Sequence, residues 1–141
     1  MTGSASLAIP ALLDEVPGVS VELERCMRSS GFSDEQILDL QLAVEEAITN
    51  IIVHGYAGTP GTIVIHCGAG PDEAIVEIFD DAPAFDPLQV AEPDISTGLD
   101  DREIGGLGIF LARKVTDAVT YRYEDGQNIL TLTKKKQKCG T

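Results

Sequence analysis

Apolar residues recur at three- and four-residue steps in two stretches of the first half of the chain, which predicts two amphipathic helices. The first helix is expected over residues 14–30, with Gly31 as its stop signal. The second is expected over residues 34–54, with Ser33 and Gln36 forming a capping-box pattern at its start. Its apolar face carries Ile37, Leu40, Val44, Ala47, Ile48, Ile51 and Ile52. Both helices should therefore bury one side against a common partner.

The remaining pattern is β-branched or alternating and predicts short strands. These are expected at residues 6–11, 62–67, 74–79, 118–123 and 128–133. The strands at 62–67 and 74–79 are joined by a short connection, and those at 118–123 and 128–133 by a turn that contains Asp125-Gly126. Each of these two pairs is expected to form an antiparallel hairpin. A further short helix is expected over residues 109–116. This order of helices and hairpins predicts an α+β two-layer sandwich in a single domain over residues 1–141.

Composition excludes several classes of protein. The chain has 141 residues, of which 43% are hydrophobic, and this is typical of one globular domain with a sound core. No apolar run approaches the ~20 residues that span a membrane, and the first eleven residues lack the features of a secretory signal. The net charge of -13 argues against a nucleic-acid partner bound through a broad basic surface. We therefore expect a cytoplasmic protein without nucleic-acid or membrane partners.

Three smaller features complete this outline. Cys26, Cys67 and Cys139 match neither a zinc site nor a disulfide framework, so reduced thiols are expected. The basic run over residues 134–138 is interpreted as a solvated tail. Residues 86–104 are rich in Pro, Gly and Asp, and a loop of this length in a compact domain indicates either a functional lid or disorder.

A carboxylate and a carboxamide stand one helical turn apart in the second helix. Glu46 and Asn50 are four residues apart and so share one face of an otherwise apolar segment. A single Glu at such a place could simply be solvated. The pair, however, is suited to hold a hydrated cation with a base beside it.

Two further segments could serve a nucleotide. Asp80 ends a predicted strand, where its carboxylate could accept a hydrogen bond from the exocyclic amine of a purine; a plain acidic turn is the alternative. Residues 105–108, Gly-Gly-Leu-Gly, precede a predicted helix, where backbone N–H groups could face phosphate. They match neither a Walker A loop nor a dinucleotide fingerprint, and a flexible joint is the alternative.

In combination these segments resemble a known family. Glu-x-x-x-Asn, then Asp-x-(Gly/Ala)-x-x-Phe, then Gly-x-Gly at a helix start is the order found in the gyrase, chaperone and histidine-kinase ATPases, the Bergerat fold. The chain is most similar to the small bacterial anti-sigma factor serine/threonine protein kinases. The closer details are residues 46–50 with 54–56, then Phe85-Asp86-Pro87, then residues 105–117 with 125–130. The resemblance covers residues 7–134, leaves 135–141 as a basic tail, and implies a mixed, mainly antiparallel sheet.

The resemblance also implies roles for individual residues. Glu46 would be the general base, Asn50 the ligand of magnesium, and Asp80 the contact to the adenine amino group. Gly106 and Gly108 would lie against the phosphates of ATP. The other residues expected at the nucleotide are Ala82, Ala84, Phe85, Gly105 and Leu107.

The same resemblance implies partners and an activity. Members of the family phosphorylate a serine or threonine of a STAS-type anti-anti-sigma protein, bind a sigma factor and are often homodimers. The expected function is thus an ATP- and Mg2+-dependent serine/threonine kinase in a partner-switching system.

Departures from the family pattern keep other readings open. Ala82 and Ala84 stand where glycine is usual, and alanine disfavours positive φ. Ile104 stands where some family kinases have an arginine, and Arg102 is the nearby alternative. A regulatory module that binds nucleotide and a protein partner with little or no phosphoryl transfer is therefore the alternative. An isolated ATPase is a third reading, disfavoured because no second domain is expected here to couple hydrolysis to work.

Overall fold

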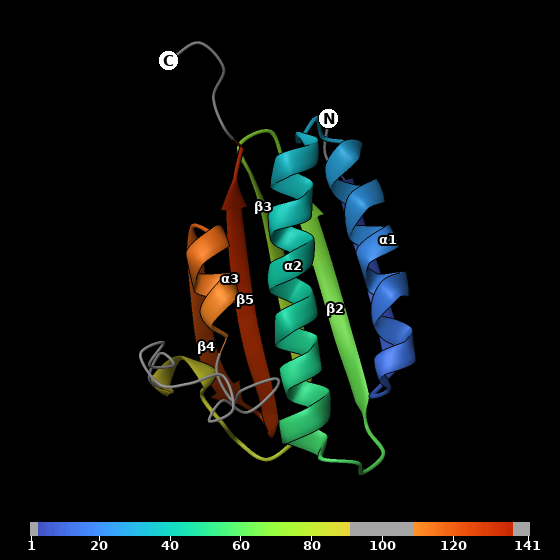
Figure 1. Cartoon of the computed structure of the whole chain (residues 1–141), viewed down its shortest axis with the longest axis vertical. Helices are drawn as coiled ribbons and strands as arrows, with labels where there is room; N and C mark the ends of the chain where they lie inside the picture. The colour runs from blue at the N-terminus through green and yellow to red at the C-terminus, as the bar shows by residue number, and fades with distance from the viewer. Residues whose placement is uncertain (1–2, 91–108, 137–141) are drawn as a thin grey trace, which may run out of the picture.

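The computed structural model describes residues 3–90 and 109–136 (Figure 1). Its helical elements are η1 (Leu13–Glu15), α1 (Val16–Arg28), α2 (Asp34–Asn50), η2 (Ile51–Tyr56), η3 (Pro87–Gln89) and α3 (Phe110–Val115). Its strands are β1 (Gly3–Pro10), β2 (Thr62–Ala69), β3 (Glu73–Asp80), β4 (Ala118–Glu124) and β5 (Gln127–Lys135). The predicted helices and strands are all present, with boundaries shifted by a few residues.

The strands form one sheet of order β1-β2-β3-β5-β4. Every pairing between neighbouring strands of the described chain is antiparallel, so the mixed sheet implied by the resemblance is antiparallel throughout. The reason lies in the position of β5. Strands β3 and β4 run in the same direction, but β5 is inserted between them and pairs with both. The predicted α+β two-layer sandwich is confirmed.

Helices α1, α2 and α3 lie on one face of the sheet (Figure 1). Alternate residues of the strands point toward them, as a period of two requires. The two layers meet in an apolar core whose largest fully buried side chains include Leu23, Met27, Leu40, Ile48, Ile63, Ile65, Ile78 and Leu132. No helix in the described part of the chain is long and apolar enough to cross a bilayer.

Helix α2 begins as its sequence predicts and ends differently. The Ser33 hydroxyl accepts a hydrogen bond from the backbone N–H of Gln36, and the Gln36 side chain accepts one from the Ser33 N–H, so the capping box is formed. After Asn50 the segment continues as the π-helical turn η2 and terminates at Ala57, which has a φ of 49°. Short π-helical segments often occur at functional sites, and this one carries residues of the pocket described below.

The basic run near the C-terminus is partly held by the fold, which corrects its interpretation as a solvated tail. Strand β5 extends to Lys135. The ammonium of Lys134 donates to Asp39 Oδ2 at 3.0 Å and to the carbonyl of Val115 at 2.7 Å. The ammonium of Lys136 donates to the carbonyl of Ser30. The pairing of β5 with β3 extends to Lys135 and so fixes the backbone of this run. Residues 137–141 lie outside the described part.

The cysteines of the described chain are free, as expected. Cys26 and Cys67 are both buried between α1 and β2, and the Cys26 thiol lies 3.7 Å from the carbonyl oxygen of Cys67. Burial raises the pKa of the Cys67 thiol, so it remains protonated and unreactive. Cys139 falls outside the described residues.

Candidate functional site

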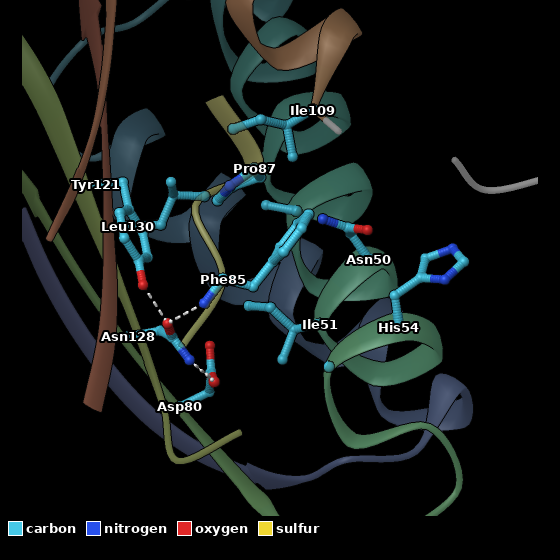
Figure 2. Close-up of a pocket in the computed structure, with 12 residues that line it drawn as sticks. Asn50, Ile51, His54, Asp80, Phe85, Pro87, Ile109, Tyr121, Asn128 and Leu130 are labelled. Atoms are coloured by element: carbon cyan, nitrogen blue, oxygen red, sulfur yellow. Dashed lines mark hydrogen bonds between the residues drawn. The ribbon is translucent and has the colours of Figure 1, made fainter. Parts of the chain in front are cut away.

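A pocket opens between the end of α2 and the ends of β3 and β5 (Figure 2). Its lining is mostly apolar, with a few polar side chains that converge on it. The lining residues are Ala47, Asn50, Ile51, His54, Gly55, Asp80, Phe85, Pro87, Ile109, Tyr121, Asn128 and Leu130. Three residues expected at the site from the sequence, Asn50, Asp80 and Phe85, are thus brought together.

Asp80 is the last residue of β3 and is only 3% exposed. Its Oδ1 accepts hydrogen bonds from the backbone N–H of Ala82 and from Asn128 Nδ2, both at 2.9 Å. Burial raises the pKa of the Asp80 carboxyl, while the bonds from Asn128 and Ala82 oppose that rise and nearby Asp81 adds to it. Both bonds fall on one oxygen, so the carboxylate keeps a second acceptor at the pocket (Figure 2).

Asn128 is a polar residue of this site for which the sequence predicted no role. It is 7% exposed, and its Nδ2 donates to Asp80 Oδ1, to the carbonyl of Ala82 at 3.0 Å and to that of Pro83 at 3.3 Å. Its Oδ1 accepts from the backbone N–H of Phe85 at 3.2 Å and from the Tyr121 hydroxyl. The available signal was its position, because Asn128 is the polar first residue of a predicted strand and is followed by Ile129 and Leu130.

The turn after Asp80 accepts alanine without strain. Neither Ala82 nor Ala84 is among the described residues with positive φ, so the expected conflict between alanine and the backbone is absent. Ala82 is buried and faces Gly55, where an added Cβ would lie 3.2 Å from the Ala82 Cβ. The missing side chain of Gly55 therefore leaves the room that the methyl group of Ala82 occupies.

Helix α2 and the π-helical turn position the opposite wall. Asn50 ends α2 and is buried, and Ile51, His54 and Gly55 follow in η2. Figure 2 shows Phe85 between this wall and the side that carries Asn128. The aromatic ring is 40% exposed and stands within the pocket rather than in the core.

Glu46 lies one turn before Asn50 and contacts α3 instead of the pocket. Its Oε1 accepts the backbone N–H of Ala112 at 2.7 Å, and its Oε2 accepts that of Leu111 at 3.3 Å. A carboxylate is favourable at the first turn of a helix because its N–H groups lack intrahelical partners. The shared face predicted for Glu46 and Asn50 is formed, but the carboxylate is engaged by α3.

Some predicted site residues lie outside the described part of the chain. These are Gly105, Gly106, Leu107 and Gly108, together with Arg102 and Ile104. The start of the expected lid is described and contains η3, where Asp86 Oδ1 accepts the N–H of Leu88. Within the described ranges, no group of three or more His, Cys, Asp and Glu side chains is arranged to hold a metal ion.

The chemistry of the pocket fits a flat heteroaromatic base. Apolar walls with a few convergent polar groups are typical of small-molecule sites. The pocket-facing oxygen of Asp80 can accept a hydrogen bond from an amino group, and Ile51, Ile109 and Leu130 supply apolar surface. The side-chain oxygen of Asn50 is the kind of ligand that magnesium prefers when phosphate oxygens and waters complete its shell.

Comparisons with known proteins identify the family of the chain. Residues 9–134 match the sequence profile of the histidine kinase-like ATPase domain. The chain belongs to this family. The resemblance to its serine/threonine kinase branch is also confirmed by curated relatives.

The serine-protein kinase RsbW of Listeria monocytogenes is 30% identical over 135 residues, which cover 92% of this chain and 86% of the relative. The serine/threonine-protein kinase BtrW of Bordetella bronchiseptica is 37% identical over 95 residues, or 67% of each chain. This chain is therefore assigned to the serine/threonine kinases of the family.

A solved structure supports the fold. The crystal structure of the RsbU and RsbW domains of a Mycobacterium tuberculosis protein superimposes with a TM-score of 0.62 and 17% identity. The match covers 95% of this chain and 33% of that one, so this chain spans about a third of the larger protein. At this identity the likeness bears on the fold alone.

Proposed function

We propose that this family member is an ATP- and Mg2+-dependent kinase that phosphorylates a serine or threonine of a STAS-type anti-anti-sigma protein. The observation that carries the proposal is the buried acceptor Asp80 facing an apolar pocket whose other wall presents Asn50. That pairing supports a nucleotide whose base lies at β3 and whose phosphates extend toward α2.

Each residue has a defined task in this proposal. Asp80 accepts a hydrogen bond from the amino group of adenine, and Asn50 supplies an oxygen ligand to Mg2+. The ion, when bound, neutralises charge on the phosphate oxygens. Glu46 accepts the proton of the substrate hydroxyl. The hydroxyl oxygen then bonds to the γ-phosphorus of ATP, and ADP leaves.

To act as a base, Glu46 must present a free lone pair of its carboxylate to the substrate hydroxyl beside helix α3. In the structure both of its oxygens accept backbone N–H groups of that helix. Those groups belong to Leu111 and Ala112, three and four residues after Gly108. We propose that residues 105–108 lie against the phosphates, with Ala82, Ala84 and Phe85 bordering the base. A shift of α3 on nucleotide binding would turn more of the Glu46 carboxylate toward the protein substrate.

The remaining parts of the proposal concern partners. A sigma factor as second partner, a homodimeric state and a cytoplasmic location follow from the family resemblance. The acidic net charge of -13 is compatible with a partner that presents basic residues.

Transfer of radiolabelled phosphate tests the kinase. The protein is incubated with γ-labelled ATP, Mg2+ and the STAS protein encoded nearest to it. Glu46→Gln should lower transfer by about 100- to 10,000-fold, while the amide oxygen still accepts an N–H of α3 and preserves the fold.

Glu45→Gln is the matched control for this variant. Glu45 is the adjacent acidic residue, and its Oε2 accepts a hydrogen bond from Ser20 on α1, away from the pocket. Its substitution should leave transfer unchanged. Full transfer by Glu46→Gln would contradict the assigned base.

The regulatory module without transfer remains a second candidate. The engagement of Glu46 by α3 favours it, because the N–H groups of Leu111 and Ala112 hold the carboxylate against that helix rather than in the pocket. Wild-type protein that binds ATP and the STAS partner, with no label transferred, would establish this module in place of the kinase.

A further inference from the structure

The amide of Asn128 is fixed in one orientation by groups that cannot reverse their roles. Backbone carbonyls of Ala82 and Pro83 can only accept, so the atom facing them is Nδ2. The backbone N–H of Phe85 can only donate, so the atom facing it is Oδ1. The Tyr121 hydroxyl donates to the same oxygen.

This fixed orientation determines that the amide group facing Asp80 is the hydrogen-bond donor Nδ2. Nδ2 donates to Asp80 Oδ1 at 2.9 Å, as does the backbone N–H of Ala82. A turned amide would place two acceptors face to face. Asp80 Oδ1 is therefore held as an acceptor, and these two bonds favour the ionised carboxylate, whose second oxygen is then an acceptor for the ligand.

We propose that Asn128 is a specificity-determining residue of the pocket, since its donated hydrogen bond keeps Asp80 an acceptor and so selects 6-amino purines over 6-oxo purines. A 6-amino group donates to Asp80, whereas a 6-oxo group presents a second acceptor. The inference rests on the proposed nucleotide site and explains why that site would prefer adenine to a 6-oxo purine.

Loss of the bond from residue 128 would change the state of Asp80. A hydrogen bond to the charged form lowers the pKa of a carboxyl, so removing it raises the pKa of buried Asp80 further. A protonated Asp80 can donate to a 6-oxo group. The choice between bases would then depend on pH, with the amino purine regaining its advantage as pH rises and Asp80 ionises.

Asn128→Thr and Asn128→Val form a matched pair for the test. The two side chains have nearly the same shape and both are suited to a strand, but only threonine can donate to Asp80. Both lose the bonds to Pro83 and Phe85 equally. Any difference between them therefore reports the donor and not the anchoring of the turn.

Calorimetry with ATP and with ITP, its 6-oxo counterpart, measures the ratio of the two affinities at pH 6 and pH 8.5. Wild type and Asn128→Thr should prefer ATP by about 10- to 100-fold at both pH values. Asn128→Val should lose at least tenfold of that preference at pH 6 and recover part of it at pH 8.5. Thermal unfolding without nucleotide verifies that both variants are folded.

The wild type and the two Asn128 variants share the other titratable groups near Asp80. The effects of pH on those groups are therefore the same in all three proteins and do not account for a difference between them. These groups are Asp81, Asp86, His54, Tyr56 and Tyr121.

The outcomes separate the inference from the proposed function. Asn128→Val with the ATP preference of the wild type at both pH values would overturn the role of Asn128 and leave the nucleotide site intact. Equal affinity of the wild type for ATP and ITP would also overturn it. Wild type that binds neither nucleotide would overturn the proposed function and this inference together.

Discussion

At the scale of single residues, the pocket is built around a buried charge that the fold does not fully compensate. Asp80 is 3% exposed and adjoins the like charge of Asp81, and burial raises the pKa of its carboxyl. Hydrogen bonds from Asn128 and Ala82 oppose the cost without removing it. Ligand sites often retain such destabilising groups because function requires them.

Asp80→Asn should therefore stabilise the protein while abolishing its response to ATP. The amide oxygen can still accept from Asn128 and Ala82, but no charge is buried. We expect the free energy of unfolding at pH 7 to rise by about 0.5–2 kcal/mol. Urea unfolding measures this change, and a thermal shift with Mg-ATP measures the lost binding.

The pH dependence of this gain has a definite sign. Because the folded pKa of Asp80 is raised, the folded state holds this proton more tightly than the unfolded state. Its contribution to stability is present below the unfolded pKa of about 3.9 and is lost as pH rises through the folded pKa. The advantage of Asp80→Asn should thus be larger at pH 7 than at pH 4; a variant less stable than wild type at pH 7 would contradict this account.

At the scale of elements, α3 is a six-residue helix that depends on side chains from other elements at both ends. Glu46 of α2 accepts N–H groups of its first turn, and Lys134 of β5 donates to the carbonyl of Val115 at its last. Isolated helices this short are unstable in water. The position of α3 is therefore set by α2 and β5 and not by its own sequence.

Lys134→Met should loosen this end of α3. The change removes an ammonium with a 16% exposed side chain and leaves Asp39 and the Val115 carbonyl without that donor. We expect a loss of about 1–2 kcal/mol in unfolding free energy, measured by urea denaturation. Lys135→Met is the neighbouring control, because Lys135 contacts Asp117 only through its backbone N–H, and it should change stability by less than about 0.5 kcal/mol. Equal losses in both variants would argue against the role of the Lys134 ammonium.

The sequence predicted those elements whose signals are local. The capping box at Ser33 and the hairpin at Asp125-Gly126 appear as expected, because each depends on a few consecutive residues. Asp80 was found because it ends an apolar strand. The role of Asn128 was missed, since its bonds reach residues 43 to 48 positions away.

Tertiary contacts also explain why the observed surroundings of Glu46 differ from the predicted ones. The helical period placed it correctly beside Asn50, but it could not reveal that α3 brings two N–H groups to its carboxylate. The π-helical turn η2 likewise has no distinct periodicity in the sequence. The predicted phosphate cradle at residues 105–108 stays a prediction.

At the scale of the whole molecule, negative charge exceeds positive charge, with a net charge of -13. The chain carries 23 acidic and 10 basic residues, and its isoelectric point is near 4.3. Ion pairs such as Arg28 with Asp34 and Arg122 with Glu124 are exposed and contribute little. Long-range repulsion should thus outweigh local attraction at neutral pH.

Added salt should consequently stabilise the free protein at pH 7. Raising NaCl from 20 mM to 500 mM shortens the screening length from about 20 Å to about 4 Å, which weakens repulsion across the molecule more than attraction within close pairs. We expect the melting temperature to rise by several degrees, on the order of 1 kcal/mol in stability. The same titration at pH 4.5, near the isoelectric point, is the control and should show a much smaller rise because the net charge is close to zero. A melting temperature that falls with NaCl at pH 7 would mean that local ion pairs, and not the net charge of -13, dominate the electrostatics of the fold.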